Sequence, residues 1–388
     1  GGAIGGSFNA FAAPLLFNRP LEYPLMLLAA LALAGTTPQL AKNLKAVIRL
    51  AMVISVISLT GLVLQKFQSS VALEWRQLVF IALFGAITPL LRIRKALLAI
   101  ACGVIIGFLF FKPFYTQTMH QVRNFYGTMR VAERVDSESG YTFNLLEHGT
   151  TTHGVQMVKP RIDLTPTGYY APTGPMALIW QFRQPQDVAV VGLGAGSLNC
   201  YAKPGQRVHF IEIDPDVVTI AKNYFTFLTS CPEPEISIGD GRLVLAADNR
   251  QYDLLIIDAF SSDSIPMHLL TREAIALYMS RLKPDGILTI HISNRFFNLA
   301  PPLAAIAADL GLTAYFGQDL KVNLVNDVMT FPSKAVVLAK DAATLQPLSY
   351  QLNTWRKLQP VSGVTSWTDD YSNAIQALEV FLPSDSKN

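Results

Sequence analysis

The feature that most constrains this chain is the uneven distribution of its apolar residues. Of the 388 residues, 51% are hydrophobic and 15% are charged, and the apolar excess lies before residue 113. Four apolar stretches separated by short polar loops make up this part, namely residues 21–35, 46–64, 77–91 and 96–111. Only the second approaches the roughly 20 residues that a bilayer core requires, and Arg49 is its sole charge. We therefore expect a helical transmembrane domain over residues 1–115, with the lipid bilayer as a partner.

Four buried core helices of a soluble protein are the alternative interpretation of these stretches. Small residues at close spacing favour the membrane, because they suit tight helix contacts in lipid. These residues are Gly1, Gly2, Gly5 and Gly6. The chain begins with glycine rather than methionine, so we also expect N-terminal residues to be missing.

Short β-branched runs alternate with helical patterns from residue 187 onward, which is typical of βαβ units in a parallel sheet. The expected strands are residues 187–193, 207–213, 235–238, 252–258 and 286–292. Helices are expected between them, for example over residues 216–227 and 267–282, and a late antiparallel edge strand is expected over residues 334–338. These patterns predict an α/β Rossmann-like domain over residues 176–345.

Two smaller regions flank this domain. Residues 123–158 alternate with period two around Gly140 and Gly149, which predicts a small antiparallel β-hairpin region within residues 116–175. Residues 346–388 are expected to form a C-terminal tail that closes on the α/β domain.

Net charge and cysteine spacing argue against two kinds of site. The formal net charge is +3 and the basic residues are scattered, without the basic stripe that tracks a phosphate backbone, so no nucleic acid is expected as a partner. The three cysteines, Cys102, Cys200 and Cys231, lie far apart, and no CxxC spacing occurs. Neither a disulfide framework nor a zinc site is indicated, and no metal is expected.

A glycine-rich turn follows the first strand of the α/β domain. In GLGAGS, Gly192, Gly194 and Gly196 allow a tight turn and a close approach of a ligand to the backbone. The helix expected next offers free N–H groups. A simple chain reversal is the alternative role of such a turn. The turn is therefore a candidate nucleotide-binding loop.

Acidic residues end the next two strands. Glu212 follows the glycines by about 20 residues, where an acidic side chain accepts hydrogen bonds from ribose hydroxyls. Its neighbour Asp214 is expected only to cap the helix that starts at Pro215. In GDGR, Asp240 is placed to accept from the exocyclic amine of adenine and Gly241 permits a sharp turn, with a helix N-cap as the alternative role of Asp240. The three sites in order predict an adenosyl ligand.

The segment LLIIDAFSSDSIPMHLLTREA, residues 254–274, resembles spermidine synthase and its aminopropyltransferase relatives, which have the class I methyltransferase type of fold. The resemblance extends over residues 123–338. It implies that Asp258 is the catalytic carboxylate and Asp263 a second, amine-binding one, although two extra residues separate them here. The apolar half, HGTTTHG and the late TDDY further resemble bacterial proteins that fuse membrane helices to a spermidine synthase-like domain.

The resemblance implies a transferase that cleaves the bond between the sulfonium and the γ-carbon of decarboxylated S-adenosylmethionine or of S-adenosylmethionine. It would release methylthioadenosine and transfer the aminopropyl group to a polyamine. The residue types agree, because such a site has to take a proton from an ammonium and hold cations nearby, and carboxylates do both. A loop contact is the alternative role of Asp258, and a helix cap that of Asp263.

Weaker candidates lie before the sheet and near the C-terminus. Tyr169 and Tyr170 are candidate substrate contacts, because aromatic faces suit a sulfonium or an ammonium, with core packing as the alternative. His153 and Gln156 lie in the stretch where the family presents a glutamine that touches the nucleoside. Asp370 is a candidate for closing over the amine pocket, with surface solvation as the alternative.

Two departures from the family weaken the case for putrescine as the acceptor. Ala195 stands where the family's glycine loop has an acidic residue that recognises the aminopropyl ammonium, and the family's acidic polyamine contacts are not evident in residues 162–174. One alternative is an S-adenosylmethionine lyase or cyclising enzyme, in which the substrate's own carboxylate or amine attacks. Another is a polyamine or nucleoside sensor or transporter, although Glu22 and Glu74 lie only at the edges of apolar stretches. His268 and His291 are expected to be structural, since neither sits in a metal-ligand spacing.

The charges of the loops and the origin of the substrate predict opposite membrane orientations. One loop carries Lys42 and Lys45 and another carries Arg92, Arg94 and Lys95, and two spans separate the loops. The positive-inside rule makes both loops cytoplasmic and leaves the C-terminal half outside. The adenosyl substrate is made in the cytoplasm, however, and we give this chemical argument more weight. We therefore expect a multi-pass protein of the bacterial inner membrane with a cytoplasmic catalytic domain, and leave homo-oligomerisation open.

Overall fold

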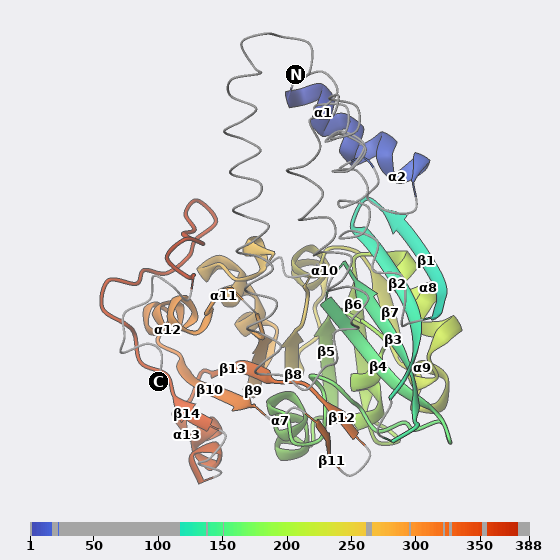
Figure 1. Cartoon of the computed structure of the whole chain (residues 1–388). Coiled ribbons are helices and arrows are strands. Elements are labelled where there is room, and N and C mark those ends of the chain that lie inside the picture. Colours follow the sequence, from blue (N-terminus) through green and yellow to red (C-terminus); the bar gives the residue numbers. More distant parts are fainter. Residues whose placement is uncertain are drawn as a thin grey trace, which may run out of the picture. The chain divides into compact units, whose positions relative to one another are not determined.

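The computed structural model forms two compact units, Gly1–Phe114 and Tyr115–Asn388. It describes residues 2–17, 22, 117–136, 139–149, 151–260, 266–294, 296–320, 323–325, 328–350 and 355–378. The elements described in the first unit are α1 (Gly2–Ser7), the π-helix η1 (Phe8–Ala12) and α2 (Ala13–Leu16) (Figure 1).

The four apolar stretches predicted to span a membrane lie, apart from residue 22, outside the described residues. Within the part of the chain that is described, no helix combines the length and the apolar character that crossing a bilayer requires.

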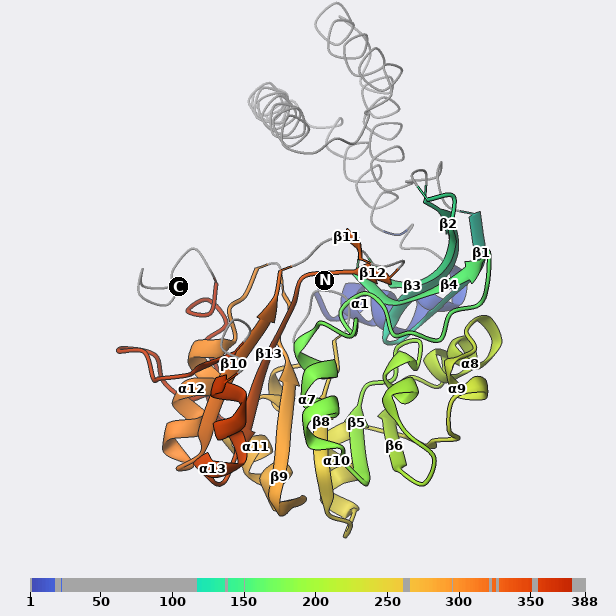
Figure 2. The same cartoon turned by 90° about the horizontal axis from the view of Figure 1, so that it is seen from below.

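The second unit is built on an eight-stranded sheet with the order β14-β10-β13-β9-β8-β5-β6-β7. Most of this order can be followed from β10 to β6 in Figure 2. The strands are β5 (Asp187–Val191), β6 (Arg207–Glu212), β7 (Glu235–Ile238), β8 (Tyr252–Ile257), β9 (Leu282–His291), β10 (Thr313–Asp319), β13 (Ser333–Ala339) and β14 (Trp355–Lys357). The five strands β5 to β9 pair in parallel, as the alternating pattern predicts. The fold is therefore Rossmann-like.

Apolar side chains cover both faces of this sheet. Along β5, Val188 and Val190 join one core cluster and Ala189 and Val191 join the other, because successive side chains of a strand point to opposite faces. The first cluster includes residues of α7 (Pro175–Arg183), the 3-10 helix η2 (Ser197–Tyr201), α8 (Pro215–Tyr224), α9 (Phe227–Ser230), α13 (Ala342–Leu345) and η4 (Gln346–Tyr350). The second includes residues of α10 (Gly241–Ala247), the 3-10 helix η3 (Met267–Leu269), α11 (Arg272–Ser280) and α12 (Ala300–Asp309).

Capping side chains set where several helices begin. Asp214 accepts a hydrogen bond from the Asp216 backbone N–H, and Pro215 occupies the first turn of α8, so the predicted capping role of Asp214 is confirmed. The helix predicted over residues 267–282 is shorter. Thr271 is the N-cap of α11, so this helix begins only at Arg272. The helix predicted over residues 216–227 is α8, which ends at Tyr224, and a separate short helix, α9, begins at Phe227.

The strand predicted over residues 334–338 exists and is antiparallel, but its predicted place at the sheet edge is wrong. It is β13, and it lies between β9 and β10, with antiparallel pairing to both. The reason is β10, which the sequence pattern did not reveal and which pairs on the outer side of β13, with β14 beyond it.

A separate antiparallel sheet precedes the α/β domain, where the sequence predicts the hairpin region. Its strands run in the order β1 (Gln117–Asn124), β2 (Gly127–Val135), β3 (Thr142–His148) and β4 (Thr151–Lys159). Met129 and Leu146 of this sheet pack with Ala195 of the glycine loop and with Ile220 and Phe227 from the α8–α9 region. The small sheet therefore packs beside the glycine loop. A two-stranded ribbon, β11 (Asn323–Val325) and β12 (Val328–Thr330), completes the described strands.

The described part of the C-terminal segment packs against the core cluster that contains α11 and α12. The Trp367 carbonyl accepts from the Arg272 N–H at 2.7 Å, and the Ala377 carbonyl accepts from the Asn298 N–H at 2.8 Å. Both Trp367 and Ala377 are buried in the cluster that contains α11 and α12.

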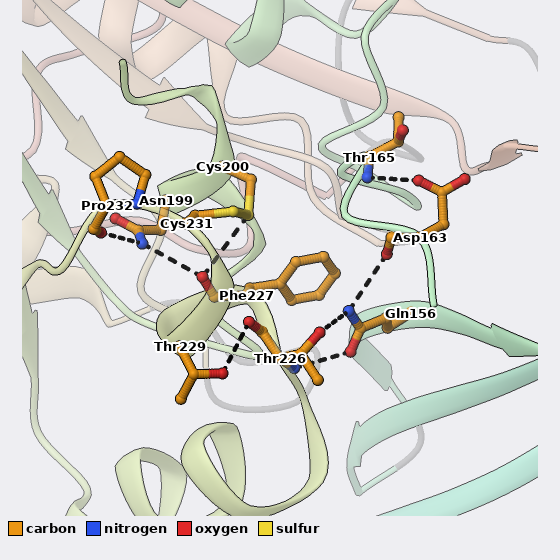
Figure 3. Close-up of a disulfide and its surroundings, with 10 residues drawn as sticks. All are labelled: Gln156, Asp163, Thr165, Asn199, Cys200, Thr226, Phe227, Thr229, Cys231 and Pro232. Carbon is orange, nitrogen blue, oxygen red and sulfur yellow. Dashed lines mark hydrogen bonds between the residues drawn. A yellow bond between two sulfur atoms is a disulfide. The ribbon is translucent and has the colours of Figure 1, made fainter. Parts of the chain in front are cut away.

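A disulfide joins Cys200 of η2 to Cys231, which follows α9, so the expectation of no disulfide is wrong. The two cysteines are 31 residues apart in sequence, yet their Cα atoms are 5.2 Å apart, within the range that a disulfide requires. The sequence spacing gave no signal because the connection between η2 and α9 passes through β6 and α8 before it returns. Figure 3 shows the bond beside Asn199, whose side-chain amide donates to the Pro232 carbonyl at 2.8 Å.

We predict that removing the disulfide lowers the free energy of unfolding of the α/β domain by about 3 to 4 kcal/mol, because a cross-link across a loop of this length restricts the unfolded chain. Denaturant unfolding of the wild type and of the Cys200→Ser/Cys231→Ser variant, followed by tryptophan fluorescence, measures the difference. Cys102→Ser is the control and should leave the curve unchanged. Coincident curves for the wild type with and without reductant would contradict the prediction.

Candidate active site

A cavity opens where the strand order of the main sheet reverses. The chain passes from β5 outward to β6 and β7, and β8 then returns to the other side of β5. In open α/β sheets ligands bind at this point, beyond the carboxyl ends of the strands. The lining residues are Tyr126, Met129, Leu146, His148, His153, Tyr170, Val191, Gly192, Leu193, Gly194, Ile211, Glu212, Ile213, Asp214, Val217, Gly239, Asp240, Gly241, Asp258, Ala259, Phe260, Pro266, His268 and Leu269.

The predicted glycine loop forms one wall of this cavity. Gly192 has φ +99°, and a Cβ atom there would lie 2.3 Å from the Asp258 carbonyl oxygen. Gly196 has φ +82°, and a Cβ atom there would lie 2.7 Å from a Leu228 methyl carbon. Only glycine meets both the backbone conformation and the space. The segment that follows is the five-residue 3-10 helix η2 rather than an α-helix, so the predicted helix N-terminus is reduced to one short turn.

Ala195 shows why this loop departs from the family pattern. Its side chain is buried, and a Cβ atom built on Gly154 of β4 would lie 2.3 Å from the Ala195 Cβ. The small antiparallel sheet thus packs directly on residue 195. A larger acidic side chain at this position would have to displace β4.

Glu212 lies at the end of β6 with its carboxylate directed to the loop. Its Oε2 accepts from the Leu193 N–H at 2.9 Å, and its Oε1 accepts from the Asp214 N–H at 3.0 Å. A carboxylate oxygen can accept a second hydrogen bond, so each oxygen keeps capacity for a ribose hydroxyl. Burial raises the pKa of Glu212 above its ordinary value, and the backbone hydrogen bonds oppose this shift.

Asp258 follows β8 and lies across the glycine loop from Glu212. Its Oδ2 accepts from the Tyr170 hydroxyl at 2.7 Å, and its Oδ1 lies 2.6 Å from Nδ1 of His291. Burial and the neighbouring charge of Asp258 raise the pKa of Tyr170 well above its usual range, so the phenol stays neutral and donates. The second predicted carboxylate, Asp263, lies outside the described residues.

Asp240 caps α10 and also contacts a histidine side chain. Its Oδ1 accepts from the Leu243 N–H at 2.9 Å, and its Oδ2 lies 2.9 Å from Nε2 of His268. Burial raises the pKa of Asp240, but the hydrogen bonds from Leu243 and His268 outweigh it and the net shift is downward. The alternative N-cap role is thus present, while Asp240 also lines the cavity. A Cβ atom on Gly241 would lie 2.3 Å from a Val191 methyl carbon, so Gly241 lets α10 approach β5.

The weaker candidates separate into two groups. Tyr170 and His153 line the cavity. Tyr169 is not among its lining residues, and its ring packs 5.3 Å from that of His291. Gln156 is fully buried and bonds both the Thr226 hydroxyl and the Thr226 N–H, as Figure 3 shows, so it joins β4 to the start of α9 rather than facing a ligand. Asp370 is exposed and also lies outside the lining.

Two histidines set aside as structural take part in the site. His268 lines the cavity and pairs with Asp240, and His291 pairs with Asp258. Metal-ligand spacing does not reveal these histidines, because their partners are single carboxylates. The signal that could have found His291 is its position at the end of β9, a parallel neighbour of β8, which Asp258 follows.

Comparisons with known proteins agree with this geometry. Residues 177–301 match the family model described as the spermine/spermidine synthase domain. This match supports the resemblance that residues 254–274 predict. Neither it nor the relatives below supports the predicted fusion to a membrane domain.

Three curated relatives match parts of the chain. A polyamine aminopropyltransferase of Vibrio vulnificus is 33% identical over 119 residues, covering 29% of this chain and 38% of the relative. A probable polyamine aminopropyl transferase of Bifidobacterium longum is 27% identical over 143 residues, covering 36% and 31%. An eEF1A lysine and N-terminal methyltransferase of Xenopus laevis is 37% identical over 84 residues, covering 20% and 12%. The chain therefore spans less than half the length of these relatives.

Two solved structures are similar at low sequence identity. A probable spermidine synthase from Corynebacterium glutamicum aligns with a TM-score of 0.49 at 14% identity, covering 68% of this chain and 99% of that one. Spermidine synthase from Thermotoga maritima aligns with a TM-score of 0.43 at 14% identity, covering 70% and 86%.

We predict that Glu212→Gln weakens binding of methylthioadenosine about 10- to 100-fold, since a hydrogen bond to a charged group contributes about 1.5 to 3 kcal/mol. Burial raises the pKa of Glu212, so wild-type affinity should fall as the pH is lowered through that raised value, because the protonated acid loses acceptor capacity. Isothermal titration calorimetry across the acid range measures both effects.

The matched control is Glu235→Gln. Glu235 is the first residue of β7, at the amino end of the strands and away from the cavity. It should keep wild-type affinity and the same dependence on pH. A Glu212→Gln variant that binds methylthioadenosine as the wild type does would contradict the assignment of Glu212 to the ribose.

Proposed function

We propose that this chain is a spermidine synthase-like transferase that moves the aminopropyl group of decarboxylated S-adenosylmethionine to an amine and releases methylthioadenosine. The observation that supports this most is the placement of Glu212, which is buried, and Asp258, whose side chain is 8% exposed, in the wall of one cavity at the point where the strand order reverses. One carboxylate is suited to a ribose and the other to a cationic reaction centre.

The charge of the cavity wall favours the decarboxylated nucleoside over S-adenosylmethionine. Glu212, Asp214, Asp240 and Asp258 all line the cavity, and no lysine or arginine is found among the described lining residues. The α-carboxylate of S-adenosylmethionine would bring another negative charge close to these groups without a cationic partner, which is unfavourable at short range. The decarboxylated form brings only positive charges.

The reaction requires a neutral amine at the γ-carbon. The acceptor arrives as an ammonium ion and passes one proton to Asp258. Its nitrogen lone pair then forms the bond to the γ-carbon while the carbon–sulfur bond breaks, and the bonding pair stays on sulfur to give neutral methylthioadenosine. Tyr170 stays neutral and holds the carboxylate in place. Because the site holds both reactants in line, proximity supplies much of the rate.

An S-adenosylmethionine lyase is the second candidate. Ala195 removes the loop carboxylate that would hold the aminopropyl ammonium, and the packing of β4 leaves no room for a larger residue there. A reaction in which the substrate's own amine or carboxylate attacks needs no external acceptor. Binding of an adenosyl ligand without turnover would instead favour the sensor or transporter.

Product analysis separates these functions. Purified full-length protein is incubated with decarboxylated or intact S-adenosylmethionine, with and without putrescine, and the products are identified by mass spectrometry. We expect methylthioadenosine and an aminopropylated amine only when an amine is present. Methylthioadenosine without amine identifies the lyase, whereas S-adenosylhomocysteine would show methyl transfer and overturn the proposal.

Asp258→Asn should lower kcat at least about 100-fold, as expected for loss of an acid–base group, and leave the affinity for methylthioadenosine within a few-fold of the wild type. Asp253→Asn is the matched control, because Asp253 lies at the other end of β8 and bonds to Lys283 away from the cavity. Full turnover in the Asp258 variant, or equal losses in both variants, would refute the role of Asp258.

Attachment to the bacterial inner membrane is part of this proposal and is supported by the four apolar stretches before residue 113. The proposed cytoplasmic place of the catalytic domain rests on the cytoplasmic origin of the adenosyl substrate, whereas the Cys200–Cys231 disulfide and the positive-inside rule favour the opposite side. When the chain is expressed with a C-terminal green fluorescent protein, we expect it in the membrane pellet after an alkaline carbonate wash, and we expect a fluorescent fusion. Release of the protein by carbonate would contradict the membrane spans. A dark but membrane-bound fusion would contradict the cytoplasmic orientation.

A further inference from the structure

The carboxylate assigned to catalysis is held by two donors from different parts of the chain. Asp258 receives the Tyr170 hydroxyl on Oδ2, and His291 lies at 2.6 Å from Oδ1. The His291 and Asp258 side chains are only 5% and 8% exposed, so water does not compete for these contacts. Their geometry is therefore set by the protein itself.

The contact with Asp258 requires a hydrogen on Nδ1 of His291. An ionised carboxylate only accepts, so the hydrogen between Asp258 and Nδ1 belongs to the imidazole. On the other side, Nε2 of His291 lies 2.6 Å from the Ser293 hydroxyl oxygen, and that oxygen accepts from the Lys334 N–H at 2.8 Å. The Ser293 hydroxyl can therefore hydrogen-bond to Nε2 while Nδ1 keeps its hydrogen toward Asp258.

Aromatic rings and the sheet hold the imidazole in this orientation. The ring of His291 packs 5.3 Å from that of Tyr169 and 5.5 Å from that of Phe260. His291 is the last residue of β9, and Lys334 belongs to β13, the antiparallel neighbour of β9. The chain of hydrogen bonds from Asp258 therefore ends in the backbone of a central strand.

We propose that His291 is a positioning residue for Asp258: its Nδ1–H, together with the Tyr170 hydroxyl, fixes the carboxylate so that its remaining acceptor sites face the cavity. This inference rests on the proposed function, because it assigns His291 to the same reaction. His291 acts through Asp258 and does not exchange protons with the substrate. A fixed carboxylate keeps the attacking amine aligned, and small displacements of such groups cost large factors in rate.

Two substitutions separate positioning from packing. Asparagine also carries its amide nitrogen at the δ position, so His291→Asn can still donate to Asp258, whereas His291→Leu fills the space without a donor. We expect His291→Leu to lower kcat about 100-fold and His291→Asn to stay within about tenfold of the wild type, with unchanged affinity for methylthioadenosine in both. Equal kcat values for the two variants at equal melting temperatures would overturn the proposal.

A double-mutant cycle tests whether His291 acts through Asp258. The His291→Leu/Asp258→Asn variant should be no slower than Asp258→Asn alone, because the histidine has nothing left to position. Multiplicative losses would show an independent role for His291 and overturn the proposal.

A readout without turnover distinguishes failure of this inference from failure of the proposed function. In full-length protein labelled with ¹⁵N-histidine, the Nδ1–H of His291 should give a slowly exchanging downfield proton resonance that is lost in His291→Asn and shifted in Asp258→Asn. If the wild type has no transferase activity but shows this resonance, the proposed reaction fails and the hydrogen bond stands. If the wild type is active and His291 is protonated on Nε2 only, the inference fails and the function stands.

Discussion

The reversal of strand order between β5 and β8 is the constraint on which the rest of the site depends. Parallel strands that share a carboxyl edge place their following loops side by side, and the reversal leaves a gap between the loops that follow β5 and β8. Glu212 and Asp258 are 46 residues apart in sequence, yet they line the same cavity because their strands flank β5 on either side. The glycine loop lies between them, and Gly192 and Gly194 line the cavity without adding side chains to it.

Two buried carboxylates are stabilised by different means. Glu212 accepts backbone N–H groups from the loop and from the residue two positions on, so its place depends on local chain geometry. Asp258 accepts from Tyr170 and His291, which come from segments before β5 and at the end of β9. Burial of a carboxylate without such donors would be costly. Glu212 therefore depends on the loop conformation, and Asp258 depends on the assembled sheet.

The small antiparallel sheet shapes one side of the cavity and limits what the loop can carry. Gly154 of β4 lies against Ala195, and Gln156 of the same strand bonds to Thr226. The disulfide between Cys200 and Cys231 joins the segment after the loop to the end of α9. The two connections hold the residues on either side of α9. The close contact of Gly154 with Ala195 therefore leaves no space for an acidic side chain at position 195.

The sequence alone determined the parallel strands β5 to β9, the glycine loop, and the positions of Glu212 and Asp258 at strand ends. These features depend on local chain propensities and on the rule that strand ends gather at one edge, so the pattern of residues 187–258 was enough. It also indicated the adenosyl class of ligand.

Tertiary structure decided the rest. The internal place of β13 depends on β10, the disulfide depends on the packing of η2 beside α9, and the partnership of His291 with Asp258 depends on two neighbouring strands. For the same reason Gln156, expected at the ligand, bonds to Thr226, and His291, expected to be structural, contacts Asp258. Whether a polar side chain faces a ligand or a neighbouring segment is set by contacts between residues far apart in sequence, which no local pattern encodes.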